Sequence, residues 1–262
     1  MLESMRLADG AAAPAADSLR ERVVLVTGAT GGLGRATSLA VARAGATIVL
    51  LGRKVRRLEA LYDEIEEAGA PTPALYPMDL EGATPKDHAD LAATIERDFG
   101  RLDGLVHAAA QFDTLQPFEQ QTAEEWSRTQ RVNVTAPFLL TGACLPVLRR
   151  AHAAAIVFVF DDMARVGKAF WGGYGVAKHA LLGLASIVHE ETENSSVRTH
   201  AVLPGPMRTA LRRAAYYGED TLAHPDPAYV AAAIAWLLGD AGCAARGKVL
   251  DLRAVAANLA MS

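Results

Sequence analysis

One stretch decides the fold: Val23-Val24-Leu25-Val26-Thr27-Gly28-Ala29-Thr30-Gly31-Gly32-Leu33-Gly34. A short β-branched run leads into a glycine-rich turn, and an amphipathic stretch follows at once. Glycine permits a tight turn and lets the backbone approach a phosphate closely. The N-terminus of the helix that follows adds free N–H groups and a partial positive charge. The stretch therefore predicts a strand, a turn and a helix that together can hold an anionic ligand.

The rest of the chain repeats this alternation of short β-branched runs and longer amphipathic stretches. We expect strands at Val23–Thr27, Thr47–Leu51, Ala74–Met78, Gly104–Ala108, Ile156–Phe160, Val197–Val202 and Lys248–Leu252. We expect helices near Leu33–Ala44, Lys54–Ala68, Lys86–Phe99, Ala123–Arg150 (bent at Pro137), Gly173–Glu193 and Pro227–Leu238. Because strands that are apolar throughout are buried on both faces, the pattern predicts an α/β fold with one doubly wound, Rossmann-like parallel sheet of about seven strands.

The chain shows no internal repeat and no linker that would divide it. We expect a flexible N-terminal tail over residues 1–20, where an Ala-rich piece contains Pro14, and a single domain over residues 21–262. The irregular piece Pro204–Asp226 is the candidate for a mobile loop over a pocket.

Composition and charge exclude several classes of protein. Hydrophobic residues make up 51% and charged residues 21% of the 262 residues, which excludes disorder across the whole chain. The formal net charge of −4 argues against a nucleic-acid partner. No uninterrupted apolar run reaches the ~18 residues of a membrane span, and no basic segment precedes an apolar core near the N-terminus, so we expect a cytoplasmic protein without a membrane partner. The two cysteines, Cys144 and Cys243, match no zinc or redox spacing, which predicts a reducing compartment and no metal site.

The glycines of the turn are spaced to carry a dinucleotide. Gly28, Gly32 and Gly34 form the pattern G-x-x-x-G-x-G, and Thr30 and Leu33 lie between them. This spacing differs from the widespread G-x-G-x-x-G fingerprint, but it also leaves the backbone open to a pyrophosphate in the first strand–helix unit. A glycine-rich turn without a ligand is the alternative.

The residues after the second strand select the dinucleotide. NAD-binding proteins usually place Asp or Glu about 20 residues past the turn, where it holds the ribose hydroxyls. This chain has Arg53 there, with Lys54 and Arg56 as further candidates. A guanidinium can bind the adenosine 2′-phosphate of NADP with two charge-assisted hydrogen bonds. We therefore expect NADP, held by Arg53, with NAD as the alternative.

A second motif, Tyr174-Gly175-Val176-Ala177-Lys178, completes the pattern. The glycine turn and this Y-x-x-x-K pair, at their distance along the chain, resemble the short-chain dehydrogenase/reductase family over roughly Glu21 to Leu252. The resemblance implies an oxidoreductase in which a bound nicotinamide dinucleotide supplies the hydride and the protein supplies position and electrostatics.

The resemblance also implies roles for residues elsewhere in the chain. Asn133, in Val132-Asn133-Val134, matches the helix asparagine that holds a water in the family's proton relay, and Lys178 matches the lysine that binds the nicotinamide ribose. The other cofactor contacts that it implies are Asp79 at the adenine, Leu80, Ala109, and Pro204, Gly205 and Thr209 on the nicotinamide side.

The spacing of Tyr174 and Lys178 suits acid–base chemistry. Residues at i and i+4 share a helix face, so both side chains can point into one cleft. A free Tyr has a pKa near ~10 and is a poor base at neutral pH. Because a nearby Lys ammonium favours the phenolate, we expect Lys178 to lower the pKa of Tyr174, which becomes the candidate acid/base.

The chain departs from the family pattern beside the substrate. The family has a Ser thirteen residues before the Tyr, and this chain has Asp161 there. An ionised carboxylate would oppose negative charge on a substrate oxygen by about 4 kcal/mol at ~4 Å and an effective dielectric of ~20. Three interpretations stay open: a protonated Asp161 that donates a hydrogen bond, an ionised Asp161 that suits a cationic or iminium-like substrate, and a protein that binds dinucleotide with little or no turnover.

A second departure follows the fourth strand. The family's N-N-A-G is His107-Ala108-Ala109-Ala110 in this chain. We expect a structural role for His107, because the position lies at a strand end beneath the cofactor rather than at the reacting carbon.

These observations lead to one preferred function and one alternative. We expect an NADP-preferring oxidoreductase of a small or medium apolar carbonyl or alcohol, with Tyr174, Lys178, Asn133 and Asp161 at its active site. The candidate pocket wall is Phe112, Phe170, Trp171, Met207, Tyr216 and Tyr217. The resemblance implies a homodimer or homotetramer that packs through the two long helices. The alternative is a dinucleotide-binding regulatory or scaffold protein with a weak or silent active site.

Overall fold

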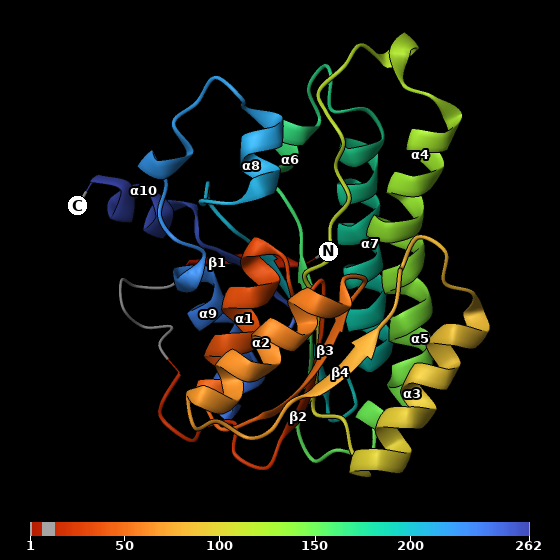
Figure 1. Cartoon of the computed structure of the whole chain (residues 1–262), viewed down its shortest axis with the longest axis vertical. Coiled ribbons are helices and arrows are strands. Elements are labelled where there is room, and N and C mark those ends of the chain that lie inside the picture. The colour runs from red at the N-terminus through yellow and green to blue at the C-terminus, as the bar shows by residue number, and fades with distance from the viewer. Residues whose placement is uncertain (1, 7–13, 262) are drawn as a thin grey trace.

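One parallel sheet forms the centre of the protein (Figure 1). The computed structural model describes residues 2–6 and 14–261. In that part of the chain the strands lie in the order β1-β8-β7-β6-β5-β2-β3-β4, and every neighbouring pair is parallel. Their bounds are β1 Glu3–Arg6, β2 Val23–Thr27, β3 Thr47–Gly52, β4 Ala74–Pro77, β5 Gly104–His107, β6 Ala154–Val159, β7 Val197–Leu203 and β8 Lys248–Asp251. The predicted doubly wound α/β fold is confirmed.

Helices cover both faces of the sheet, so the protein has two apolar layers. Their bounds are α1 Gly32–Arg43, α2 Val55–Glu67, α3 Pro85–Phe99, α4 Ala123–Gln130, α5 Ala136–Leu148, α6 Met163–Val166, α7 Gly172–Thr192, α8 Ala210–Ala215, α9 Ala228–Leu238 and α10 Arg253–Met261. Helices α1, α2 and α9 bury their apolar faces in one layer. Helices α3, α5 and α7 do so in the other. Strands between two such layers must be apolar on both sides, as the sequence pattern indicated.

The N-terminal segment corrects two expectations. Glu3–Arg6 forms β1, which pairs with β8 at the sheet edge and brings the strands of the described chain to eight rather than about seven. Leu2 and Leu19 are buried, so the expected loose tail is wrong for these stretches, while residues 7–13 lie outside the described residues. An edge strand is held by its backbone and leaves most of its side chains exposed, so its sequence lacks an apolar run.

The long helix expected over Ala123–Arg150 is interrupted before Pro137 rather than at it. A π-helical turn, Arg131–Thr135, separates α4 from α5. Within it the Asn133 side chain donates from Nδ2 to the Thr129 carbonyl oxygen (2.9 Å). In a regular α-helix the Thr129 carbonyl would accept from the backbone N–H of residue 133. Here the Asn133 side chain bonds to that carbonyl, and the helix widens into a π-helical turn. Such turns often occur near functional sites.

The same helical stretch, Ala123–Leu148, has the length and mean hydropathy (1.3) of a membrane span by composition. Of its most apolar window, 44% is buried inside the protein. Its Leu140, Cys144 and Leu148 belong to the apolar layer that α3 and α7 share. This packing is that of a helix in the core of a sheet protein.

The irregular piece over Pro204–Asp226 contains more regular structure than its sequence indicated. Thr209 caps α8 by accepting a hydrogen bond from the Arg212 backbone N–H (3.2 Å). A 3₁₀ turn, Thr221–Ala223, follows it under a cap from Asp220. Short capped helices with little periodicity are not distinguished from loops by hydrophobic pattern alone.

Candidate active site

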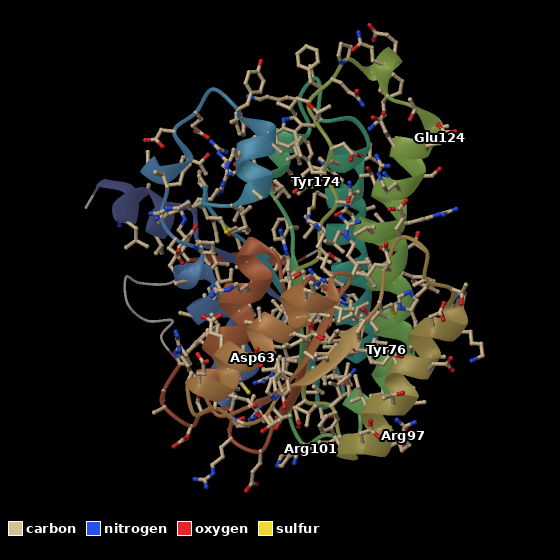
Figure 2. All side chains as sticks on the ribbon, in the orientation of Figure 1. Asp63, Tyr76, Arg97, Arg101, Glu124 and Tyr174 are labelled. Atoms are coloured by element: carbon tan, nitrogen blue, oxygen red, sulfur yellow. The ribbon has the colours of Figure 1, made fainter. Side chains whose placement is uncertain are left out.

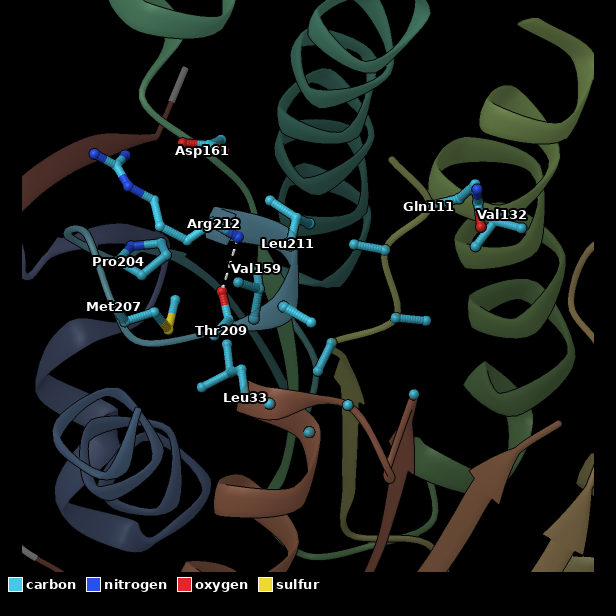
Figure 3. A pocket seen from close by; sticks show the side chains of 18 of the residues that line it. Leu33, Gln111, Val132, Val159, Asp161, Pro204, Met207, Thr209, Leu211 and Arg212 are labelled. Carbon is cyan, nitrogen blue, oxygen red and sulfur yellow. Dashed lines mark hydrogen bonds between the residues drawn. The ribbon is translucent and has the colours of Figure 1, made fainter. Parts of the chain in front are cut away.

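A cavity of about 440 Å³ lies at the carboxyl ends of the central strands. Open α/β sheets bind ligands at this edge, where the strand order reverses between β2 and β5. Figure 3 shows Leu33 at the bottom of the cavity, Asp161 at the top, and Gln111 and Val132 along one side. The predicted cofactor residues that line it are Gly28, Thr30, Gly32, Leu33, Gly34, Arg53, Asp79, Leu80, Ala109, Lys178, Pro204, Gly205 and Thr209.

The glycine turn forms one end of the cavity and fits a diphosphate. Gly28 has a φ of +63°, and a Cβ there would lie 2.7 Å from the Ala109 Cα. A Cβ on Gly34 would lie 2.1 Å from the Gly28 carbonyl oxygen. Gly31, the N-cap of α1, supplies no side-chain hydrogen bond to the first helical turn. The turn therefore presents backbone and free N–H groups to the cavity, which is the arrangement that binds phosphate.

Basic side chains stand beside the glycine turn. Arg53, directly after β3, is exposed and lines the cavity. Arg57 and Arg35 line an adjoining hollow, where the Arg35 guanidinium donates to Glu64 (2.7 Å). Asp79 lies on the cavity wall after β4 and accepts a hydrogen bond from the Glu81 N–H (3.1 Å). The donor set at this end is cationic and open, which fits a dinucleotide with an additional phosphate on its ribose.

Tyr174 and Lys178 lie at the other end of the cavity, on the first turns of α7. Figure 2 shows Tyr174 where α6, α7 and α8 come together. Both side chains are buried, with 4% of Tyr174 and 3% of Lys178 exposed. Lys178 donates from Nζ to the Val159 carbonyl oxygen (3.0 Å), and its nitrogen lies 5.5 Å from the centre of the Tyr174 ring. The sequence prediction that the pair shares one cleft is thus met by the geometry.

The electrostatics of the pair differ from the sequence prediction. Burial raises the pKa of Tyr174 well above its usual value, and the Asp161 carboxylate raises it further. Burial lowers the pKa of Lys178 to about 8, against the opposing effect of Asp161. The net lowering of the Tyr174 pKa that the sequence predicted is therefore not found in the protein without a ligand. The reason is that desolvation and an adjacent carboxylate both disfavour the phenolate.

Asp161 accepts three hydrogen bonds at the substrate end of the cavity. Its Oδ2 accepts from the Tyr174 hydroxyl (3.2 Å). Its Oδ1 accepts from the Asp162 N–H (2.7 Å) and from the Arg165 guanidinium. Each of these three groups, all in the described part of the chain, donates its hydrogen bond to the carboxylate. The surroundings therefore match the ionised form of Asp161, which can only accept.

Arg165 and a set of aromatic rings enclose this carboxylate. The Arg165 guanidinium lies 4.8 Å from the centre of the Trp171 ring and donates to the Tyr216 hydroxyl (3.2 Å). The Phe112 ring meets the Tyr174 ring edge-on at 5.2 Å. These rings belong to a small apolar cluster apart from the two main layers. This end of the cavity thus combines the Asp161–Arg165 ion pair with apolar lining from Met207, Leu211 and Ala215, while the aromatic cluster packs behind it.

Asn133 and His107 lie behind the cavity and brace it. Asn133 accepts at Oδ1 from the Gln111 N–H (3.0 Å) and donates from Nδ2 to the Gln111 carbonyl oxygen (2.8 Å). His107 bonds through Nε2 to the Thr141 hydroxyl (2.9 Å) and stacks on Phe158. Burial lowers the pKa of His107 to about 3, so the ring is neutral at physiological pH. Asn133 therefore fixes the Gln111 segment of the wall, and His107 serves the interior as predicted.

Comparison with known proteins identifies the family. A family model described as short chain dehydrogenase matches residues 22–220. The chain belongs to the short-chain dehydrogenase family. It is 34% identical to the uncharacterized oxidoreductase YciK of Escherichia coli strain K12, over 91% of this chain and 94% of the relative. A solved short-chain dehydrogenase from Pseudomonas syringae is 38% identical, with a TM-score of 0.86, covering 94% of this chain and 99% of the other.

One further solved relative carries a dinucleotide. A short-chain dehydrogenase from Escherichia coli CFT073, complexed with NADPH, is 35% identical, with a TM-score of 0.87, and the match covers 91% of this chain and 99% of the relative. The likeness extends over nearly the whole of both chains. This protein is therefore an NAD(P)-dependent short-chain dehydrogenase/reductase by family, with the single α/β domain that such structures share.

Several side chains of this dehydrogenase were misplaced or missed by sequence reasoning. Of the residues expected in the pocket wall, Met207 lines the cavity. Phe112, Trp171 and Tyr216 pack in the cluster around Tyr174 without lining it, and Phe170 and Tyr217 are 56% and 94% exposed. Arg165 and Arg212 line the cavity but were not predicted. The spacing of Asp161 and Arg165, four residues apart, is the signal that could have identified the ion pair. Among the described residues, no group of three or more His, Cys, Asp or Glu side chains is placed to hold a metal.

Proposed function

We propose that this short-chain dehydrogenase transfers a hydride between NADP and a small or medium apolar carbonyl compound or alcohol, with Tyr174 as the acid/base. One observation carries the proposal: the Tyr174 hydroxyl and Lys178 line the same cavity as the glycine turn. A ligand that spans the cavity would therefore have phosphates at one end and its reacting group at the other.

The chain's own residues would hold the dinucleotide at defined places. The turn of Gly28, Gly32 and Gly34 would bind the pyrophosphate through backbone N–H groups. Arg53 would bind the adenosine 2′-phosphate, which supports NADP over NAD, as does the NADPH found in the Escherichia coli relative. When bound, the dinucleotide supplies or accepts the hydride. The contacts proposed for its remaining parts are Thr30, Leu33, Asp79, Leu80, Ala109, Lys178, Pro204, Gly205 and Thr209.

Tyr174 would hold the proton that the substrate oxygen receives. In a reduction the phenol donates this proton as the oxygen gains negative charge, and in an oxidation it takes the proton back. Lys178 has a pKa of about 8 and carries its charge at neutral pH, so it favours the phenolate once the proton has left. Asn133 would keep the Gln111 segment in place beside a water that passes protons toward Lys178.

The wall beside Tyr174 supports an apolar substrate. The rings of Phe112 and Trp171 contact the Tyr174 ring, and Tyr216 contacts Trp171 in turn. Ala215 and Met207 border the same space. A pocket of this kind binds by burying apolar surface and uses a few polar groups for orientation.

We further propose that the enzyme is cytoplasmic and forms a homodimer or homotetramer. Large apolar side chains are exposed on the long helices: Phe138 of α5 is 59% exposed, and Val176 and Ile187 of α7 are 50% and 58% exposed. Apolar surface on neighbouring helices is typical of an interface between subunits. Size-exclusion chromatography with light scattering should give a multiple of the monomer mass, and a monomer at micromolar concentration would contradict this.

The hydride transfer is tested with purified protein and a panel of apolar ketones, aldehydes and alcohols. NADPH oxidation or NADP reduction is followed by absorbance, and dinucleotide binding is measured separately by fluorescence. We expect saturable NADPH binding and measurable turnover of at least one carbonyl that Tyr174→Phe abolishes. Binding without turnover in either direction would contradict the proposed reaction.

A further inference from the structure

The Asp161 carboxylate occupies the place where the substrate's polar atom must lie, next to the Tyr174 hydroxyl. It lines the cavity and is 8% exposed, so little water shields it. Its Oδ1 is occupied by the Asp162 N–H and by the Arg165 guanidinium. Its Oδ2 faces the Tyr174 hydroxyl at 3.2 Å and keeps capacity for a second donor. This oxygen therefore offers a substrate an acceptor, not a donor.

An acceptor at this position disfavours oxygen chemistry in both directions. A carbonyl oxygen gains negative charge as a hydride reaches its carbon, and a neighbouring carboxylate opposes that charge. An alcohol could donate its proton to Asp161 in the ground state. Its oxidation nevertheless passes through the same transition state as the reverse reduction, so the carboxylate opposes it equally.

Nitrogen chemistry has the opposite charge change. A protonated imine enters with a positive charge and an N–H donor, and the charge on nitrogen decreases as the carbon is reduced. A carboxylate that accepts from this N–H is compatible with the substrate and with the transition state.

We propose that the preferred substrate is a cyclic, largely apolar imine, which Asp161 holds through a hydrogen bond from the protonated imine nitrogen to Oδ2. This inference rests on the hydride transfer proposed above and replaces the carbonyl group of its substrate with a C=N group. A cyclic compound is inferred because open-chain imines hydrolyse readily in water, and an apolar one because Met207, Leu211 and Ala215 line the cavity.

The reaction balances without a further reagent. The imine carbon gains the hydride that the reduced dinucleotide supplies, and a C–H bond forms. The π pair of the C=N bond becomes the lone pair of the nitrogen, which keeps the proton that it carried from solvent. The products are a cyclic amine and the oxidised dinucleotide. Tyr174 need not donate a proton in this reaction, and it orients Asp161 instead.

Arg165 is a positioning residue in this arrangement. Its guanidinium bonds to Oδ1, while its other end donates to the Tyr216 hydroxyl and its face lies against Trp171. These contacts hold the cation at Oδ1, whereas the Tyr174 hydroxyl bonds to Oδ2. Arg165 therefore stabilises the ionised carboxylate and leaves Oδ2 free to accept from a substrate.

Activity on a matched pair of substrates tests the inference first. Dihydroisoquinoline and α-tetralone are bicyclic compounds of similar size that differ in a C=N or C=O group. With NADPH, the wild-type protein should show a higher kcat/KM for the imine. Asp161→Ser should reduce the imine-to-ketone ratio roughly ten- to hundredfold, the range for one hydrogen bond to a charged group. Asp162→Ser, the control, should leave the ratio unchanged, because that carboxylate caps α6 and pairs with Arg253.

Binding of a cationic product analogue tests the same contact without turnover. Tetrahydroisoquinoline, a protonated cyclic amine, should bind the NADP-loaded protein in calorimetry. Asp161→Asn, which keeps the size of the side chain, should weaken this binding roughly tenfold or more, with the dinucleotide affinity unchanged. Thermal melting of each variant shows whether it is folded.

The outcomes separate this inference from the proposed function. A wild-type preference for the ketone, or equal amine binding by wild type and Asp161→Asn, would overturn the inference and leave carbonyl reduction standing. Imine turnover that Asp161→Ser lowers, without any carbonyl turnover, would support the inference and overturn the carbonyl assignment. NADPH binding with turnover of neither compound and no amine binding would overturn both.

Discussion

The two ends of the cavity are built in different ways. At the dinucleotide end the backbone forms the site: Gly28 and Gly34 allow close backbone contacts that a Cβ would prevent, and Arg53 adds charge at the rim. At the substrate end the side chains of Asp161 and Tyr174 meet in an ion-paired, aromatic setting. Backbone geometry depends on residues adjacent in sequence, whereas a side-chain cluster depends on which distant residues meet. The first end could therefore be predicted from a local motif, while the second depends on how the chain folds.

The largest effect is expected at the substrate end, from Tyr174→Phe. Loss of the phenolic proton donor should lower kcat for carbonyl reduction roughly 10²–10⁴-fold. NADPH affinity should stay within about twofold, because the ring that borders the cavity is retained. Tyr217→Phe is the control, since Tyr217 is 94% exposed. If Tyr174→Phe instead weakened NADPH affinity and left kcat at saturating NADPH unchanged, the assignment of separate dinucleotide and substrate ends would be wrong.

The next effect is expected at the dinucleotide end, from Gly34→Ala. The added Cβ would lie 2.1 Å from the Gly28 carbonyl oxygen, so the turn must move. We expect NADPH affinity to fall roughly tenfold to a hundredfold, which corresponds to the ~1–3 kcal/mol of a steric insertion. Gly142→Ala, in α5, meets nothing within 4 Å and should leave affinity unchanged. Fluorescence titration checks both variants, and equal affinities would contradict the proposed phosphate site.

A smaller, selective effect is expected from Arg53→Ala. The guanidinium is proposed to bind a phosphate that NADH lacks, so NADPH affinity should fall roughly tenfold or more while NADH affinity changes little. Arg43→Ala, an exposed arginine in the last turn of α1, is the matched control. An equal loss for both coenzymes would show that Arg53 acts through general charge and not through the 2′-phosphate.

The smallest effect concerns the interior beneath both ends. Burial lowers the pKa values of His107 and His200 to about 3 in the folded protein, below the ~6.5 of an unfolded chain. Below pH ~6.5 the unfolded state binds more protons than the folded state. The free energy of unfolding therefore has its full value, as far as these rings affect it, above that pH. It decreases below it by up to about 1.4 kcal/mol per pH unit for each ring.

Urea unfolding at pH about 7.5 and about 5.5 checks this dependence. His107→Gln keeps a polar group beside Thr141 and should reduce the loss of stability between the two conditions. His152→Gln changes an exposed histidine and should behave as the wild type. The same loss of stability in wild type and His107→Gln would show that the buried ring does not contribute.

The fold could be predicted from the sequence where apolar periodicity is strong. The inner strands and the long helices of both layers lie where their patterns placed them, because strands buried on both faces must be apolar. The edge strand β1 was missed because its contacts are backbone hydrogen bonds to β8, which leave no apolar pattern. The π-helical turn at Asn133 was missed because it depends on a side-chain bond to Thr129.

The candidate site could be predicted where a motif defines backbone geometry. The glycine turn, Tyr174 and Lys178 line one cavity, as their spacing indicated. The sequence left the state of Asp161 open because its partners were unknown. Arg165 lies in the short helix α6, which the sequence did not reveal, and its bond to Asp161 pairs this largely buried carboxylate with a cation. Burial raises the pKa of Tyr174, and the same carboxylate raises it further.

Titration of the purified protein with NADPH, followed by quenching of tryptophan fluorescence, tests the central claim most directly. Trp171 lies beside Tyr174, with ring centres 5.7 Å apart, so a reduced nicotinamide at the substrate end should quench it. We predict saturable quenching at micromolar NADPH, with weaker binding of NADH. An unchanged signal up to millimolar concentrations of either coenzyme would contradict the placement of a dinucleotide across this cavity.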